Sequence, residues 1–250
     1  MFALITGASK GIGYEMAYLL AEKYDLILVA RSKDKLNEMA IDISTKFENR
    51  VIVMDYDLTK SEDIDRLFKN TKSFDIEVVI NNAGVGRVGM HHEISDEDDW
   101  NMIKLNVIAM HRILKEYSSR MVDGYILNVA SIASFSAGPK MATYYATKNY
   151  ILAYSKAVNF ENKKMGKKVS SSALCPGPVD TCFNENANVT FKLKGMNARK
   201  CAKIALKKMF KRKSVICPSF KVKVASIFMK ILPSGFIMRM CYRLQNKKTN

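Results

Sequence analysis

Short runs of β-branched and aliphatic residues alternate along this chain with longer amphipathic stretches. The runs indicate buried strands and occupy residues 2–6, 26–30, 51–55, 76–81, 125–130 and 169–175. The stretches between them, such as 11–24, 33–47 and 61–70, carry apolar residues three and four positions apart, which is typical of helices that cover a sheet. Strict alternation predicts parallel strands joined by right-handed crossovers. We therefore predict an α/β fold of the Rossmann type, a doubly wound parallel sheet flanked by helices.

The composition fits one large domain followed by an extension. The chain has 250 residues, of which 48% are hydrophobic, and no repeat or linker interrupts the alternation. We assign residues 1–217 to a single domain and 218–250 to the extension. Five scattered cysteines without a C-x-x-C pair, no basic signal region at the start and no long apolar run predict a cytoplasmic protein with reduced thiols. His91 and His92 are adjacent, so their side chains are expected to point apart, and we predict no metal site there.

The positive charge is concentrated in the last quarter of the chain. The formal net charge is +16, yet residues 186–250 hold 17 of the 40 Lys and Arg and none of the 24 acidic residues. The first 185 residues, with 23 basic and 24 acidic side chains, are nearly neutral. We therefore expect the C-terminal quarter to face an anionic partner.

A glycine-rich turn, TGASKGIG at residues 6–13, follows the first predicted strand and opens a helix. Glycines let the backbone turn tightly and approach a pyrophosphate held by amides at the helix N-terminus. The spacing differs from the phosphate loop of nucleotide triphosphatases. We expect a dinucleotide here, bound by Gly7, Ser9, Lys10, Gly11, Ile12 and Gly13. The alternative is a plain strand-to-helix turn.

The end of the second predicted strand favours NADP(H) over NAD(H). An NAD(H) site usually places a carboxylate here for the ribose 2′-hydroxyl, but no acidic residue lies between Leu26 and Lys33. Arg31, together with Lys10 of the glycine turn, can pair with a 2′-phosphate. The alternative is that Arg31 only covers the sheet edge in solvent.

Tyr144 and Lys148 form a candidate acid–base unit. Residues four apart lie on one face of a helix, and a nearby cation lowers the pKa of a phenol from its ordinary value of about 10. Ser131 follows the fifth predicted strand, and ligands of such sheets bind at the carboxyl ends of the strands. These three side chains are therefore expected in one crevice.

Together these motifs resemble the short-chain dehydrogenase/reductase family over residues 1–217. Residues 6–13 match its glycine motif, residues 81–84 (NNAG) its segment after strand four, and residues 176–181 (PGPVDT) its segment after strand six. The catalytic tetrad of the family is matched in order and spacing by Asn106, Ser131, Tyr144 and Lys148. The resemblance implies hydride transfer between NADP(H) and a ketone, aldehyde or alcohol.

The resemblance also implies individual roles. Tyr144 would exchange the proton, Ser131 would hold the substrate oxygen, and Asn106 would anchor a water that returns the proton. Lys148 would lower the pKa of Tyr144 and bind the nicotinamide ribose. Further cofactor contacts are implied for Asp57, Leu58, Asn82, Ala83, Gly84, Pro176, Gly177, Val179 and Thr181.

The extension contains two predicted basic amphipathic helices, at residues 220–232 and 236–244. The first apolar stripe is Val224, Ile227, Phe228, Ile231 and Leu232, and the second is Ile237, Met240, Cys241 and Leu244. Reversible attachment to an anionic membrane surface and packing on the protein itself, as a lid or subunit contact, are both consistent with this pattern. A nucleic-acid partner is disfavoured, because aliphatic residues rather than stacking aromatics separate the charges.

We therefore predict an NADPH-dependent reductase of a ketone or aldehyde that forms a homodimer or homotetramer. Its expected partner is a small-molecule substrate, and the apolar extension favours a hydrophobic one. Specificity is expected to lie in residues 183–194 and in the extension. The alternative function is a non-catalytic, membrane-associated module that binds NADPH, and the intact tetrad argues against it.

Overall fold

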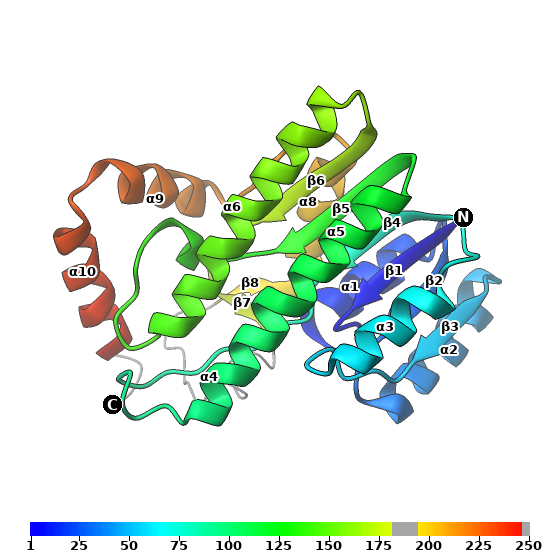
Figure 1. Cartoon of the computed structure of the whole chain (residues 1–250), viewed down its shortest axis with the longest axis horizontal. Helices are drawn as coiled ribbons and strands as arrows, with labels where there is room; N and C mark the ends of the chain where they lie inside the picture. The colour runs from blue at the N-terminus through cyan, green and yellow to red at the C-terminus, as the bar shows by residue number, and fades with distance from the viewer. Residues whose placement is uncertain (182–194, 247–250) are drawn as a thin grey trace.

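The computed structural model describes residues 1–181 and 195–246 and contains a seven-stranded parallel sheet (Figure 1). The strand order is β3-β2-β1-β4-β5-β6-β9, so the direction of travel across the sheet reverses between β1 and β4. Its strands are β1 (Phe2–Thr6), β2 (Asp25–Val29), β3 (Val51–Met54), β4 (Ile76–Asn81), β5 (Asp123–Val129), β6 (Lys168–Leu174) and β9 (Val215–Ile216). A separate parallel pair is formed by β7 (Val179–Asp180) and β8 (Met196–Asn197). The predicted Rossmann-type fold is confirmed.

Helices cover both faces of the sheet. One face packs against α1 (Gly11–Leu20), α2 (Lys33–Phe47) and α8 (Ala198–Met209). The other face packs against α3 (Ser61–Asn70), α5 (Met110–Arg120) and α6 (Ala142–Lys164). Helix α4 (Asp96–Ile103) continues through the π-helical turn η1 (Lys104–Ala109) into α5, and a short 3₁₀ turn, η2 (Ile132–Phe135), follows β5. Helices α9 (Phe220–Ile231) and α10 (Ser234–Asn246) form one end of the molecule, at the left of Figure 1.

Strand β1 shows why both faces must be covered. Ala3 and Ile5 belong to the core beneath α1, α2 and α8, whereas Phe2 and Leu4 belong to the core beneath α3 and α5. Successive side chains of a strand point to opposite faces, so a strand buried on both faces is a continuous apolar run. The six apolar runs in the sequence therefore located β1 to β6 to within two residues at each end.

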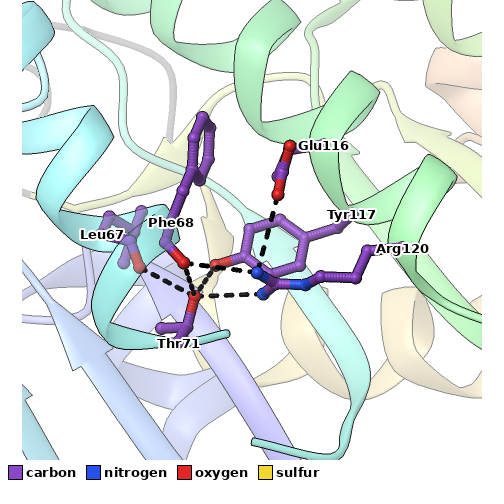
Figure 2. A network of polar contacts seen from close by, with 6 residues as sticks. All are labelled: Leu67, Phe68, Thr71, Glu116, Tyr117 and Arg120. Atoms are coloured by element: carbon purple, nitrogen blue, oxygen red, sulfur yellow. Dashed lines mark hydrogen bonds and ion pairs between the residues drawn. The ribbon is translucent and has the colours of Figure 1, made fainter. Parts of the chain in front are cut away.

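A buried polar network joins the end of α3 to α5 (Figure 2). The hydroxyl oxygens of Thr71 and Tyr117 lie 2.7 Å apart, and the Thr71 hydroxyl also donates to the carbonyl of Leu67 at 2.7 Å. The Arg120 guanidinium donates to Thr71 Oγ1 at 3.0 Å and lies 4.6 Å from the centroid of the Tyr117 ring. Burial raises the pKa of Tyr117 to about 12. The tyrosine is thus a neutral partner that connects two helices beneath the sheet.

We predict that Tyr117→Phe lowers the free energy of unfolding by about 1–2 kcal/mol, because a buried hydrogen bond is lost while the ring still fills its site. Urea denaturation of both proteins measures this difference. The matched control is Tyr150→Phe, which removes the exposed contact of 2.8 Å between the Tyr150 hydroxyl and His111 Nδ1. An equal loss of stability in both variants would show that the buried network stabilises the fold no more than an exposed hydrogen bond does.

Candidate active site

The predicted site residues gather at the carboxyl edge of the sheet. Thr6, Asn81 and Val129 end β1, β4 and β5, and parallel strands bring these ends to one edge. The strand order reverses between β1 and β4, and a crevice forms outside the sheet at such a reversal. The glycine turn and the NNAG segment therefore lie side by side on the two sides of this point.

The glycine turn is shaped by positions that only glycine occupies without strain. Gly7 and Gly11 adopt left-handed φ angles of 65° and 61°. A Cβ added to Gly13 would lie 2.5 Å from the carbonyl oxygen of Gly7 and 2.5 Å from Asn82 Nδ2. Lys10 precedes α1 and makes no side-chain capping bond, so the first amides of the helix are not capped by it. This is the cradle that a pyrophosphate requires, and a dinucleotide fits the residues present.

Thr6 and Asn82 connect the two sides of the crevice. The Thr6 hydroxyl accepts hydrogen bonds from the backbone amides of Asn82 at 2.9 Å and Ala83 at 3.0 Å. In return, Asn82 Nδ2 donates to the carbonyls of Thr6 at 3.0 Å and Gly7 at 3.1 Å. The sequence analysis predicted that Asn82 contacts the cofactor. In the structure the Asn82 side chain is hydrogen-bonded to the backbone of the glycine turn.

Two exposed cations lie near the adenosine end of the predicted cofactor site. Arg31 directly follows Ala30 at the end of β2, and both Arg31 and Lys10 are exposed. Among the described residues, no hydrogen bond or ion pair holds the Arg31 guanidinium. Beside it, Lys33 lies 3.7 Å from the carboxylate of Asp55. The arrangement leaves Arg31 available to an anion.

The predicted adenine contacts occupy the turn after β3. Asp57 Oδ1 accepts hydrogen bonds from the amide and hydroxyl of Thr59, at 3.0 and 2.8 Å, and Leu58 is buried. The Asp57 carboxylate is therefore engaged in forming the turn that leads into α3. The Asp57 amide also donates to Asp63 Oδ2 at 3.0 Å, and the Asp57 carbonyl accepts from the amide of Lys60 at 2.9 Å.

Ser131, Tyr144 and Lys148 meet at the end of β5. Ser131 begins η2, where its hydroxyl accepts from the amide of Ala133 at 3.1 Å, so its orientation is fixed. A hydrogen bond links Ser131 to the phenol of Tyr144. Lys148 Nζ donates to the carbonyl of Val129 at 2.9 Å and lies 5.8 Å from the centroid of the Tyr144 ring. The expected three-residue grouping is therefore present.

Burial drives the two titratable groups of this cluster in opposite directions. It raises the pKa of Tyr144 to about 12, while the hydrogen bond with Ser131 acts to lower it. Burial also lowers the pKa of Lys148 to about 8. The spacing argument predicted a Tyr144 pKa below 10. The shift has the opposite direction, because desolvation of the phenol outweighs the hydrogen bond with Ser131.

Asn106 lies within the π-helical turn η1 and ties the site together. Its Oδ1 accepts from the amide of Val85 at 2.9 Å, and its Nδ2 donates to the carbonyl of Val85 at 2.8 Å and to Thr147 Oγ1 at 3.1 Å. A Cβ on Gly84 would lie 3.1 Å from Asn106 Oδ1 and 3.2 Å from Lys148 Nζ. The NNAG glycine thus gives both side chains room.

The segment after β6 closes the crevice opposite the glycine turn. The Pro176 carbonyl accepts from the amide of Ile132 at 2.8 Å. Val179 is buried in the core, and a Cβ on Gly11 would lie 3.1 Å from the methyl group of Thr181. Residues 176–181 are therefore placed beside the predicted cofactor site. The expected specificity segment 183–194 lies outside the described residues.

The inner face of α10 forms a wall beside the catalytic cluster. Ile237 and Cys241 share a buried cluster with Tyr145, and Tyr144 packs against it. Gln245 Nε2 donates to the Tyr145 hydroxyl at 3.3 Å. The sequence analysis assigned no role to Tyr145 or Gln245. The sequence did contain a signal for the burial of Gln245, because this residue lies four positions after Cys241 and so on the same helix face. A polar residue at that position does not look like a buried one, so the signal was not recognised.

Comparisons with known proteins agree with this geometry. A profile of the short chain dehydrogenase family matches residues 1–191. The chain is 34% identical over 183 residues to the very-long-chain 3-oxoacyl-CoA reductase of Phaeosphaeria nodorum, a match that covers 67% of this chain and 52% of that protein. The chain thus spans about half the length of this relative.

Solved structures extend the likeness over almost the whole chain. A short-chain dehydrogenase from Sphingobium yanoikuyae in complex with NADPH has a TM-score of 0.85 and 28% sequence identity, over 94% of both chains. An enzyme of the family from Burkholderia phymatum in complex with NAD has a TM-score of 0.82, but at 20% identity, over 91% of this chain and 92% of that one, it shows the shared fold alone. The chain belongs to the short-chain dehydrogenase/reductase family of oxidoreductases.

We predict that Gly13→Ala lowers the free energy of unfolding by about 1–3 kcal/mol, because the new methyl group meets the fixed carbonyl of Gly7. Urea denaturation without added nucleotide gives the value. Gly235→Ala in α10 is the control, since nothing lies within 4 Å of its added Cβ. If both variants unfold like the original protein, the contact between the glycine turn and Asn82 is looser than described.

Proposed function

We propose that this protein is an NADPH-dependent reductase of a ketone or aldehyde, with Tyr144 as the proton donor. The observation that carries the proposal is the cluster at the end of β5, in which Ser131 is hydrogen-bonded to the Tyr144 phenol and Lys148 Nζ lies 5.8 Å from the centroid of the Tyr144 ring. The chemistry that bound NADPH supplies is hydride transfer to the carbonyl carbon. A protonated phenol is the form that the reducing direction needs, since the carbonyl oxygen must gain a proton.

Each residue of the cluster has a distinct task. Tyr144 donates its proton to the substrate oxygen, and Ser131 holds that oxygen by a hydrogen bond while negative charge develops on it. Lys148, largely cationic at neutral pH, binds the nicotinamide ribose and favours the phenolate left after transfer. Asn106, with its amide fixed by Val85, positions the water that returns a proton to Tyr144.

The residues that would hold the cofactor lie along the carboxyl edge of the sheet. The glycine turn would bind the pyrophosphate, and Arg31 with Lys10 would bind the 2′-phosphate. The turn after β3 would hold the adenine, and the segment after β6 would hold the nicotinamide. The remaining proposed contacts are Asp57, Leu58, Asn82, Ala83, Gly84, Pro176, Gly177, Val179 and Thr181.

The substrate is a hydrophobic carbonyl compound, with a 3-oxoacyl thioester as the leading class. Two observations support this choice: the apolar wall that Ile237 and Cys241 build beside Tyr144, and the name of the relative from Phaeosphaeria nodorum. The alternative function is a non-catalytic module that binds NADPH. Such a module would not need the acid–base cluster of Ser131, Tyr144 and Lys148, so the cluster favours the enzyme.

The protein acts as a homodimer or homotetramer in the cytoplasm. Ile108 and Tyr150 are exposed on neighbouring helices, and the rings of His111 and Tyr154 stack at 4.4 Å, with the Tyr150 ring 6.2 Å from His111 and 5.8 Å from Tyr154. This exposed apolar and aromatic surface supports a subunit contact there. Four of the five cysteines lie in the described residues, and all four are free, which supports a reducing compartment.

We predict that Tyr144→Phe reduces turnover of a carbonyl panel, followed by loss of NADPH absorbance, by about 10²- to 10⁴-fold. Binding of NADPH, measured by fluorescence titration, should change little, because the ring remains in place. Tyr150→Phe, on the exposed side of the same helix, should retain full turnover. Undiminished activity of Tyr144→Phe would remove this residue as the acid.

We predict that Arg31→Asp shifts the preference from NADPH toward NADH, because a carboxylate repels the 2′-phosphate and accepts bonds from a 2′-hydroxyl. Parallel titrations with the two nucleotides measure the ratio of dissociation constants. Lys46→Asp makes the same charge change at the far end of α2 and should leave the ratio unchanged. Unaltered NADPH affinity in Arg31→Asp would place the 2′-phosphate elsewhere.

A further inference from the structure

Helices α9 and α10 pack on the rest of the protein with only one of their faces. On α9, a Cβ at Gly177 would lie 2.8 Å from a methyl group of Val222, and the buried Ser226 is hydrogen-bonded to the thiol of Cys217. On α10, the buried residues are Ile237, Cys241 and Gln245, four positions apart. These contacts fix the orientation of both helices, so the opposite faces point outward.

The outward faces are apolar. On α9, Phe220, Ile227 and Ile231 share one stripe, and Phe220 and Ile231 are 79% and 74% exposed. On α10, the exposed residues Phe236, Met240 and Leu244 repeat every four positions. The α9 stripe predicted from the sequence was Val224, Ile227, Phe228, Ile231 and Leu232. The last four are exposed and Val224 is half-buried. Contiguous exposed apolar surface of this kind marks an interaction site.

The charged residues beside these stripes all have the same sign. Among the described residues, α9 carries Lys221, Lys223 and Lys230, and α10 carries Arg239 and Arg243, with no acidic residue on either helix. All five are exposed. Lys221 lies on one side of the α9 stripe, whereas Lys223 and Lys230 lie on the other. Long basic side chains that flank an apolar stripe can reach headgroups while the stripe enters the acyl region.

We propose that this surface, the outer surface of α9 and α10, docks onto an anionic phospholipid bilayer. The two helices meet at Leu232 and Pro233 at one end of the molecule, as Figure 1 shows, so the apolar residues around this junction reach the bilayer first. They are Phe228, Ile231, Leu232 and Phe236, all exposed. The attachment is interfacial, since the described helices include none that could cross a bilayer.

The charges favour a bilayer over the other possible occupants. In a symmetric contact between two copies the same patch faces itself, so five positive charges would oppose five. A nucleic acid would satisfy these charges but would leave the aliphatic stripes without an apolar partner. An anionic bilayer offers both an anionic layer and an apolar one.

Docking places the candidate active site beside the membrane. The inner face of α10 contacts Tyr145, adjacent to Tyr144, while its outer face contacts the lipid. A carbonyl substrate with a long acyl chain therefore has a short route from the bilayer to the crevice. This consequence rests on the proposed reductase function, whereas docking itself does not.

The test is flotation of the full chain with phosphatidylcholine vesicles that contain or lack phosphatidylglycerol. We expect binding that needs the anionic lipid and weakens with added salt. The double variant Phe228→Ser and Ile231→Ser should bind at least about tenfold more weakly, because two exposed apolar side chains no longer enter the bilayer. The matched control is Ile41→Ser with Phe160→Ser, at 70% and 62% exposure on other helices, which should bind like the original protein.

Insertion is read directly from a tryptophan placed at the junction. The sequence has one tryptophan, Trp100, so Phe236→Trp in a Trp100→Phe background reports on α10 alone. We expect a blue-shifted emission with anionic vesicles. No shift and no flotation, or equal flotation of both double variants, would overturn the proposal.

Two further measurements separate the remaining outcomes. A dimer in sedimentation velocity that only the Phe228→Ser, Ile231→Ser variant converts to monomers would show that a second copy covers the surface, and would also overturn the proposal. Tyr144→Phe should float like the original protein. Vesicle binding and carbonyl turnover can therefore fail independently.

Discussion

The exchange of hydrogen bonds between Thr6 and Asn82 is the constraint on which the site depends. It joins the ends of β1 and β4, the two adjacent strands between which the chain changes direction. Without this tie, nothing but the strand ladder would set the distance between the glycine turn and the NNAG segment. Each of these bonds pairs a side-chain group of Thr6 or Asn82 with a backbone group of the opposite segment, so the tie depends on the identity of both residues.

Burial controls the chemistry of the cluster at the end of β5. A water-poor environment penalises charge on any group, so Tyr144 becomes a weaker acid and Lys148 a weaker base. The lysine nevertheless finds a partner in the Val129 carbonyl. The cluster is therefore held together by a neutral hydrogen bond between Ser131 and Tyr144 and by a charged one from Lys148 to the Val129 carbonyl.

The sequence predicted the sheet and the grouping of Ser131, Tyr144 and Lys148 because both follow from local periodicity. Strand runs and four-residue helical spacing depend on nearest neighbours, and the parallel sheet then brings the strand ends together. The direction of the Tyr144 pKa shift was wrong, because desolvation depends on every atom that surrounds the phenol. The burial of Gln245 was also missed, since its partner Tyr145 lies a hundred positions earlier in the chain.

The wide turn at Lys104–Ala109 limits how this chain can change in length. A π-helical turn holds one more residue than an α-helical turn in the same rise, and here that turn carries Asn106. Loss of a single residue there would let the turn relax into a regular α-helix while α4 and α5 kept the same faces toward the core. Ile113 and Tyr117 would stay packed, whereas Asn106 would lose the position from which its side chain bonds to Val85. The extra residue of the turn therefore serves the placement of Asn106 and not the packing of the helices.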